Sequence, residues 1–537
     1  MKSCQQCRHA KRKCVPSKAT NLLHPCNRCL RRHLVCSRSQ PQLAGTRRLG
    51  ARRSQSPASQ SRRNAVDDFL ADEDAVVDLV HEYLSKIHDR PHSIFHTATL
   101  WNDIRQQRLS KALLLAICAM GAHVSSRPTA QSLEPLLTAE SKRLLQIDIE
   151  RVCLENIQTC ILVANLCVAH ANPSSEFLFF RTAIAMVQLM QPFTGHVNGK
   201  AVINEIWVRI WWSLFAADNW CSSSLGLQRQ MKDWPRPARL PMDECRFAEM
   251  APDQPLHEPY LDLDLGLWAY MATLIELFGP IQEFNWRAVN GEVLLQDQLE
   301  QDTDRLAQRL DDWQDRLPRH VQLTESNLIE HSKRGTGGIF MGLHLGFHHY
   351  ATLLYYQYLD TRFTLTTRTR RFAARCKYHA LGYSMLLANG RQLPGCEAVY
   401  PTVGHMAIVS SSVLLHTLLF GTEDDLPQSR HCLEVNFEAL LELERFWPSV
   451  KAMINRLLNF QNTCLLFSYR HHTHRLDRWM VRFLFEYALP LNDKAANPHS
   501  AAEMEIISTQ AQMFSQQGRL STFWNGPEAR SELPQGL

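Results

Sequence analysis

The first 66 residues of this chain contain no aspartate and no glutamate, although they carry 16 lysines and arginines. The remaining 471 residues carry 42 basic and 53 acidic side chains, so the net charge of +5 for the whole chain conceals a strong asymmetry. A small basic head joined to a large acidic body favours a polyanion as the partner of the head. Nucleic acid fits better than an anionic membrane, because no amphipathic helix with exposed Trp, Phe and Leu accompanies the charge.

The sequence also has few features of secreted or membrane proteins. The N-terminus has no apolar segment of the signal-peptide type, which argues against secretion. The longest apolar runs, 112–124 and 406–420, are too short to span a bilayer. Sixteen cysteines without a secretory signal predict reduced thiols, metal sites or small buried side chains rather than a disulfide framework. We therefore expect an intracellular protein with no membrane partner.

Composition divides the chain into four regions. Residues 1–40 are cysteine-rich and basic. Residues 41–66 are rich in Ser, Gln, Arg and Pro, with almost nothing to bury, and are predicted to form a disordered basic linker. Residues 67–490 carry the helical periodicity described next, and residues 491–537 are predicted to form a polar, loosely ordered tail.

Helical periodicity dominates residues 67–490, whereas the alternation typical of strands is scarce. In residues 72–87 the apolar side chains Val76, Val80, Tyr83, Leu84 and Ile87 share one face at i, i+3 and i+4 spacing. Similar faces recur at 111–124, 150–170, 176–191, 203–221, 339–359, 371–388, 404–420, 436–459 and 476–489. The body is therefore predicted to be a large all-α domain.

The head contains six cysteines in an internal repeat. CQQCRHAKRKC (4–14) and CNRCLRRHLVC (26–36) both have the pattern C-x2-C-x6-C, and each cysteine recurs 22 positions later. Six thiolates cannot fill two separate tetrahedral sites, but they can hold two Zn²⁺ ions if two of the thiolates bridge both metals. Such a head would fold only with metal bound. The predicted zinc ligands are Cys4, Cys7, Cys14, Cys26, Cys29 and Cys36.

Two other interpretations of these cysteines stay open. They could hold one structural zinc as a ribbon with two spare thiols, or they could serve a protein contact. The spacing, the 22-residue repeat and the lack of acidic residues favour the two-zinc cluster.

With its two C-x2-C-x6-C halves, the head resembles the DNA-binding domain of fungal binuclear zinc cluster transcription factors. The resemblance implies that Cys4 and Cys26 bridge the two metals and that the other four cysteines are terminal ligands. Two positions depart from the family pattern, since Val15 stands where an aspartate is usual and Ala10 where a basic residue is frequent.

The resemblance also implies a set of DNA contacts. Residues 8–13 would enter the major groove, where Lys11 would read the guanines of a CGG triplet through their O6 and N7 acceptors. Phosphate contacts, which give affinity but no sequence information, are implied for Arg8, Lys13, Arg31 and Arg32.

The body in turn resembles the all-helical middle homology region of fungal transcription factors. The stretch RIWWSLFAADNWCSSSLG (209–226) has the family's arginine, tandem tryptophans, phenylalanine, aspartate and later Leu-Gly. Taken alone, these residues predict core aromatics at Trp211, Trp212 and Phe215, and a capping or pairing role for Asp218.

The predicted architecture is therefore a small zinc-stabilised two-helix cluster, a flexible linker and a large all-α regulatory domain. It predicts a nuclear, zinc-dependent regulator of RNA polymerase II genes that binds double-stranded DNA and has no catalytic residues. The family resemblance suggests control of a metabolic or secondary-metabolite pathway. A homodimer, the transcriptional machinery and a small-molecule effector stay open as partners. The alternative is a scaffold or enzyme whose zinc head serves only protein docking.

Overall fold

The computed structural model describes residues 57–88, 93–192, 200–254, 265–289, 295–360, 366–471, 483–484 and 500–520. The chain divides into two units, Met1–Ser61 and Arg62–Leu537, and the fold described below belongs to the second, apart from residues 57–61. Among the described residues, regular structure other than helix is limited to one β-bridge between Met242 and Leu265. The prediction of a large all-α domain is confirmed.

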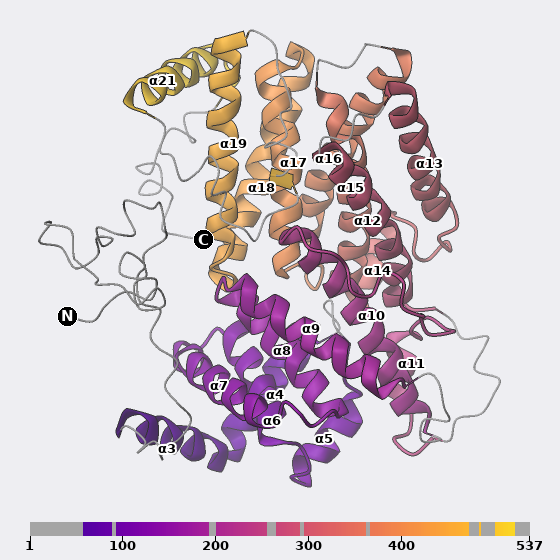
Figure 1. The fold of residues 1–537 in the computed structure, drawn as a ribbon, viewed down its shortest axis with the longest axis vertical. Coiled ribbons are helices and arrows are strands. Elements are labelled where there is room, and N and C mark those ends of the chain that lie inside the picture. The colour runs from indigo at the N-terminus through magenta and orange to yellow at the C-terminus, as the bar shows by residue number, and fades with distance from the viewer. Residues whose placement is uncertain are drawn as a thin grey trace, which may run out of the picture. The chain divides into compact units, whose positions relative to one another are not determined.

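The N-terminal helices run from α3 to α11 (indigo to magenta in Figure 1). Their bounds are α3 Pro57–Ala71, α4 Glu73–Lys86, α5 Thr97–Arg105, α6 Lys111–Val124, α7 Pro128–Ile147, α8 Leu154–Ala169, α9 Pro173–Met190, α10 Ala201–Ser224 and α11 Glu244–Glu249.

The C-terminal helices run from α12 to α21, and Figure 1 shows α15 to α19 standing side by side. Their bounds are α12 Leu267–Val289, α13 Gln296–Asp315, α14 Glu325–Lys333, α15 Gly337–Tyr355, α16 Thr367–Arg391, α17 Pro401–Phe420, α18 Leu426–Phe446, α19 Val450–His471 and α21 Ala501–Gln516, with short 3₁₀ turns η2 Tyr356–Leu359 and η3 Glu423–Asp425.

Many of these helices begin at a residue that caps them. The Ser110 hydroxyl accepts a hydrogen bond from the Leu113 amide at the start of α6, and Thr324 does the same for the Asn327 amide at the start of α14. Ser500 and Glu503 form a reciprocal capping box at the start of α21. Each cap satisfies a backbone N–H that the helix itself leaves without a partner.

Two hydrophobic clusters organise the domain. The N-terminal core is the buried cluster built from α3 to α11, with Trp268 and Ala272 contributed by α12. The C-terminal core is the buried cluster built from α12 to α21, with Ala169 and Trp220 contributed by α8 and α10. Helices α8, α10 and α12 therefore contribute side chains to both cores and join them.

Several elements differ from the sequence expectation. The apolar face at 436–459 is divided between α18 and α19, because the chain leaves the helical conformation at Trp447, before Pro448. A helix, α3, begins at Pro57 within the segment expected to be a linker, since Val66 and Phe69 are buried in the N-terminal core. Helix α21 lies within the range expected to be a loosely ordered tail.

The expectation that the apolar run at 406–420 is too short to span a bilayer is wrong by length, because the run lies in the 20-residue helix α17. This helix is long and apolar enough to cross a membrane by length and composition, the one such helix among the described residues. Within the protein, 94% of the most apolar 18-residue stretch of this helix is buried. It contacts α15, α16, α18 and α19. Its hydrophobicity is therefore that of a core helix.

Candidate functional sites in the helical domain

The predicted zinc ligands and DNA contacts all lie in residues 1–40, outside the residues that the structure describes. This applies to Cys4, Cys7, Cys14, Cys26, Cys29 and Cys36, and to Arg8, Lys11, Lys13, Arg31 and Arg32. In the described part of the chain, no group of three or more His, Cys, Asp or Glu side chains could hold a metal ion. The sites described below all belong to the helical domain.

A fully buried ion pair lies at the start of the RIWW motif. The Arg209 Nε donates to Glu205 Oε1 at 2.8 Å, one turn earlier on α10, and both side chains have no exposed surface. The guanidinium also donates to Ser93 Oγ at 2.6 Å and to the Met242 carbonyl at 2.7 Å. One arginine therefore fastens two distant chain segments to α10.

The other groups around this pair complete its hydrogen bonding. Glu205 also accepts hydrogen bonds from Arg239 and, at 3.0 Å, from the Met242 amide. The Arg209 guanidinium stacks over the Phe247 ring at 4.2 Å from its centroid. A buried charge is tolerated where it is paired and hydrogen-bonded in this way, which makes the cluster a structural clamp.

Asp218, two turns further along α10, anchors the segment that follows the helix. Its carboxylate pairs with Arg181 of α9 at 3.2 Å and accepts hydrogen bonds from Ser222 at 3.0 Å and from the Met231 amide at 2.7 Å. The prediction that Asp218 caps or pairs is confirmed. Trp211 and Trp212 are buried in the N-terminal core and Phe215 packs against it at its edge, as the local pattern predicted.

A cavity of about 130 Å³ lies where the two cores meet. Its walls come from α8, α9, α10, α12, α15, the start of α17 and α19. The lining is largely apolar and includes four small residues that leave the space open, Ala216, Ala217, Gly342 and Gly346. Sequence reasoning missed this cavity, because its walls come from positions spread over almost 300 residues.

Polar groups also border this cavity, among them Trp268, Glu176 and Cys221. The indole of Trp268 is buried, and its Nε1 has no hydrogen-bond partner among the described residues. Glu176 accepts a hydrogen bond from the Cys221 thiol at 3.0 Å. Burial raises the pKa of Glu176 to about 7, and the thiol hydrogen bond opposes that rise only in part.

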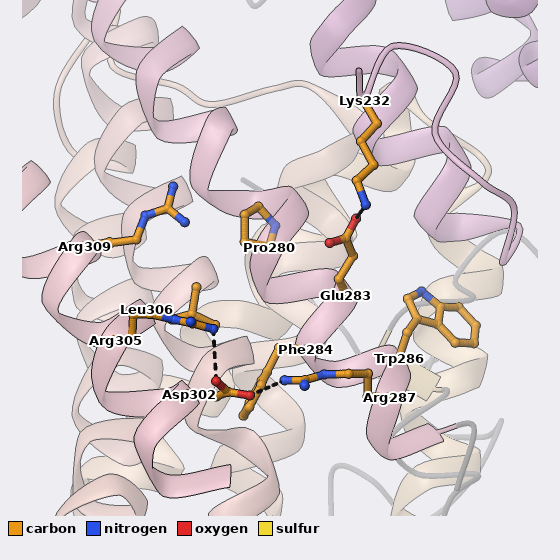
Figure 2. A pocket seen from close by; sticks show the side chains of 10 residues that line it. All are labelled: Lys232, Pro280, Glu283, Phe284, Trp286, Arg287, Asp302, Arg305, Leu306 and Arg309. Atoms are coloured by element: carbon orange, nitrogen blue, oxygen red, sulfur yellow. Dashed lines mark hydrogen bonds and ion pairs between the residues drawn. The ribbon is translucent and has the colours of Figure 1, made fainter. Parts of the chain in front are cut away.

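A second pocket, of about 580 Å³, is shown in Figure 2 and is lined by charged side chains of α12, α13 and Lys232. Arg287 and Arg305 share Asp302, at 2.6 and 2.9 Å, and Lys232 pairs with Glu283 at 2.8 Å. Lys232 is 50% exposed and Arg305 is 72% exposed, so water screens these pairs. Most of the charged side chains that line this pocket are therefore paired with one another at the protein surface.

The C-terminal core contains several buried histidines. His349 stacks on Trp220 with ring centroids 5.6 Å apart, and neither of its ring nitrogens has a partner in the part of the chain that the structure describes. His379 lies 3.2 Å from His348, measured between their Nδ1 atoms. Burial lowers the pKa of His349 to about 3 and that of His379 to about 2, which keeps both imidazoles neutral.

Residues 80–254 match the fungal specific transcription factor domain. The matched segment runs from α4 to the residues that follow α11, so it contains the Arg209 clamp, the Asp218 anchor and most of the N-terminal core. It covers about one third of the chain.

A curated relative gives the same indication. An uncharacterized transcriptional regulatory protein of Schizosaccharomyces pombe is 20% identical over 424 residues, spanning 70% of this chain and 51% of that protein. The chain thus spans about half the length of this relative. No solved structure matches the chain. The family match and the relative both support a fungal transcription regulator.

Proposed function

We propose that this protein is a zinc-dependent, sequence-specific regulator of RNA polymerase II transcription that acts in the nucleus. The observation that carries the proposal is the occurrence, in one chain, of the C-x2-C-x6-C repeat at 4–36 and the match of residues 80–254 to the fungal specific transcription factor domain. Two independent parts of the sequence thus point to one class of protein. The expectation that the protein controls a metabolic pathway is part of the same proposal.

In this proposal the two parts of the chain have separate tasks. The head holds two Zn²⁺ through its six cysteines, and its basic side chains contact DNA. The helical domain contributes regulation through partners, through a second copy of the chain or through an effector. No catalytic role is assigned to either part.

Metal content is the first test of the head. The purified full-length protein is expected to contain two equivalents of zinc, and a Cys4→Ser variant is expected to lose metal together with specific DNA binding. Native mass spectrometry gives the metal count directly. A single equivalent in the intact protein would contradict the two-zinc cluster.

Selection of bound oligonucleotides from a random pool tests the sequence preference. The full-length protein is expected to enrich CGG triplets, and their spacing and the stoichiometry of the complex report whether it binds as a monomer or a dimer. Recovery of no consensus sequence would contradict specific recognition.

Two basic residues of the head form a matched pair for a sharper test. Lys11→Ala is expected to reduce discrimination between CGG and a mutated triplet by about 1–3 kcal/mol, because it removes a contact to base edges. Arg31→Ala is expected to weaken binding to all sequences alike and to reduce the salt slope by about 0.9, because it removes one phosphate contact. Both effects are measured by binding titrations at several salt concentrations. Equal behaviour of the two variants would contradict the assignment of Lys11 to base reading.

A further inference from the structure

The pocket between α12 and α13 has an excess of positive charge (Figure 2). Four of its lining side chains are cations and two are carboxylates, so the lining carries a net charge of +2. The cations are Lys232, Arg287, Arg305 and Arg309, and the carboxylates are Glu283 and Asp302. Residues 67–537 as a whole are acidic, with 42 basic and 53 acidic side chains. The charge of this pocket is therefore opposite in sign to that of the region that contains it.

Both carboxylates of the pocket are already shared. Asp302 pairs with Arg287 at 2.6 Å and with Arg305 at 2.9 Å, as Figure 2 shows. Glu283 pairs with Lys232 at 2.8 Å and also with a second cation, an arginine that follows α10. Each carboxylate thus serves two cations, and one negative charge does not neutralise two positive charges.

Arg309 is a cation of this pocket without an ion pair. It is exposed, and no hydrogen bond or ion pair joins its side chain to another residue in the part of the chain that the structure describes. Other acidic residues of α13 have partners elsewhere, since Asp304 and Asp311 pair with arginines of α16 at 3.2 and 2.5 Å. The Arg309 guanidinium is therefore available to a group from outside the chain.

The size and the charge of the pocket match a small phosphate compound. Its volume of about 580 Å³ lies within the range of about 300–1,000 Å³ that small-molecule sites occupy. A phosphate monoester carries about two negative charges at pH 7 and three acceptor oxygens, so one such group would balance the excess charge of the lining. A single carboxylate would balance half of it. A long polyanion such as DNA fits less well, because the acidic balance of the domain opposes it beyond the pocket.

We propose that the pocket between α12 and α13 binds a small phosphorylated molecule, whose phosphate monoester group pairs with Arg309 and with the cations beside it. This inference gives the proposed regulator a class of effector, so its regulatory meaning rests on the proposed function, whereas the binding itself does not. The ligand would join α12, α13 and the segment that follows α10, because these elements supply the cations.

Phenyl phosphate and methyl phenyl phosphate form a matched pair of probes for the purified full-length protein. The first is a monoester with about two negative charges, and the second is a diester with one. Phenyl phosphate is expected to bind about fivefold more tightly, because its second charge meets a cation that the diester leaves uncompensated. Isothermal titration calorimetry gives both affinities. Equal affinities would overturn the assignment to a phosphate monoester.

Arg309→Gln removes the unpaired cation, and Arg319→Gln is its control. Arg319 is likewise exposed and without an ion pair among the described residues, but it does not line the pocket. Arg309→Gln is expected to weaken phenyl phosphate binding about fivefold, and Arg319→Gln is expected to leave it unchanged. Neither exposed substitution is expected to shift the thermal midpoint. Equal affinities of the two variants would overturn the proposal, because the phosphate would then bind elsewhere, for example at the basic head.

Asp302→Asn tests the charge balance in the opposite direction. The substitution removes one carboxylate and raises the net charge of the lining from +2 to +3. Phenyl phosphate is expected to bind about threefold more tightly to this variant, and the gain is expected to shrink as salt is added. Weaker binding by this variant than by the unmodified protein would overturn the proposal.

Binding of a CGG duplex, measured on the same samples, separates this inference from the proposed function. Absence of Arg309-dependent phosphate binding with intact CGG recognition would overturn the pocket assignment alone. Arg309-dependent binding of phenyl phosphate without sequence-specific DNA recognition would support the pocket and contradict the proposed function. Displacement of phenyl phosphate from the Arg309-dependent site by a duplex that lacks CGG would overturn the assignment to a small molecule.

Discussion

The two cores of the helical domain bury polar groups of different kinds. The N-terminal core surrounds a charged clamp, in which Glu205 and Arg209 are both inaccessible to water and hold two distant chain segments, one at Ser93 and one at Met242. The C-terminal core contains neutral imidazoles, such as His344, His349 and His379. The stability that a buried ion cluster gives is lost when one of its partners is removed. The stability of a core with buried neutral imidazoles instead falls when the pH is lowered. The clamp is therefore expected to respond mainly to loss of a partner, and the C-terminal core mainly to acid.

The largest effect is expected from breaking the clamp. Arg209→Met leaves Glu205 buried with Arg239 as its remaining cationic partner, and the free energy of unfolding is expected to fall by about 3–5 kcal/mol. Urea denaturation followed by circular dichroism measures the change. The matched control is Arg334→Met, because Arg334 also pairs with a glutamate one turn earlier, Glu330, but at 58% and 51% exposure.

This control is expected to change stability by less than about 0.5 kcal/mol. If both arginine variants were equally destabilised, the difference in burial would not account for the role of Arg209.

The next largest effect concerns acid and the C-terminal core. Burial lowers the pKa of His344 to about 4, that of His349 to about 3 and that of His379 to about 2, from an ordinary value near 6.5. Below pH 6.5 the unfolded chain therefore binds protons that the folded protein does not, so stability falls as the pH falls. Between pH 6.5 and 5.5 each imidazole is expected to contribute a loss of about 1 kcal/mol, about 3 kcal/mol for the three.

A single substitution isolates one of these imidazoles. His349→Phe keeps an aromatic ring beside Trp220 and removes a group whose nitrogens have no partner among the described residues. Unfolding at several pH values is expected to show a pH dependence smaller by about 1 kcal/mol over the same interval, with stability at pH 7.5 unchanged or higher. His81→Phe, at an exposed position on α4, is expected to leave the pH dependence as it is. A similar change in both variants would argue against burial as the cause.

The smallest effects are expected from helix caps, which the two halves share. Ser110→Ala removes the cap of α6 and Thr324→Ala the cap of α14, and each is expected to lower the free energy of unfolding by about 1 kcal/mol. Because both caps are neutral hydrogen bonds, neither loss is expected to vary between pH 5.5 and 7.5. A strongly pH-dependent loss in either variant would show that the acid response has a source other than the imidazoles.

Periodicity alone located many helices of this domain and failed at specific points. The apolar run at 111–124 coincides with α6, since a continuous buried segment flanked by Ser110 and Ser125 leaves little ambiguity. The polar sequence of α13 conceals a narrow stripe of Leu299, Leu306 and Leu310, which only packing against other helices makes visible. The division between α18 and α19 depends on the local conformation at Trp447, which periodicity does not encode.

The sites divide in the same way between local and long-range causes. The role of Asp218 could be predicted because an aspartate among buried aromatics requires a partner. The partners of Arg209 could not, since Ser93 lies 116 residues before it and Met242 lies 33 residues after it. The cavity is determined by what seven helices leave unfilled, and no single stretch of sequence contains that information.

Helix α17 has a consequence for how this protein is made. Helices α15 and α16, which precede α17 in the chain, bury part of its surface. Helices α18 and α19, which leave the ribosome after it, bury another part. Until those last two helices are synthesised, one apolar face of this 20-residue helix stays exposed to solvent in the nascent chain. Chains that terminate early, before Val450, are therefore expected to need chaperones and to aggregate.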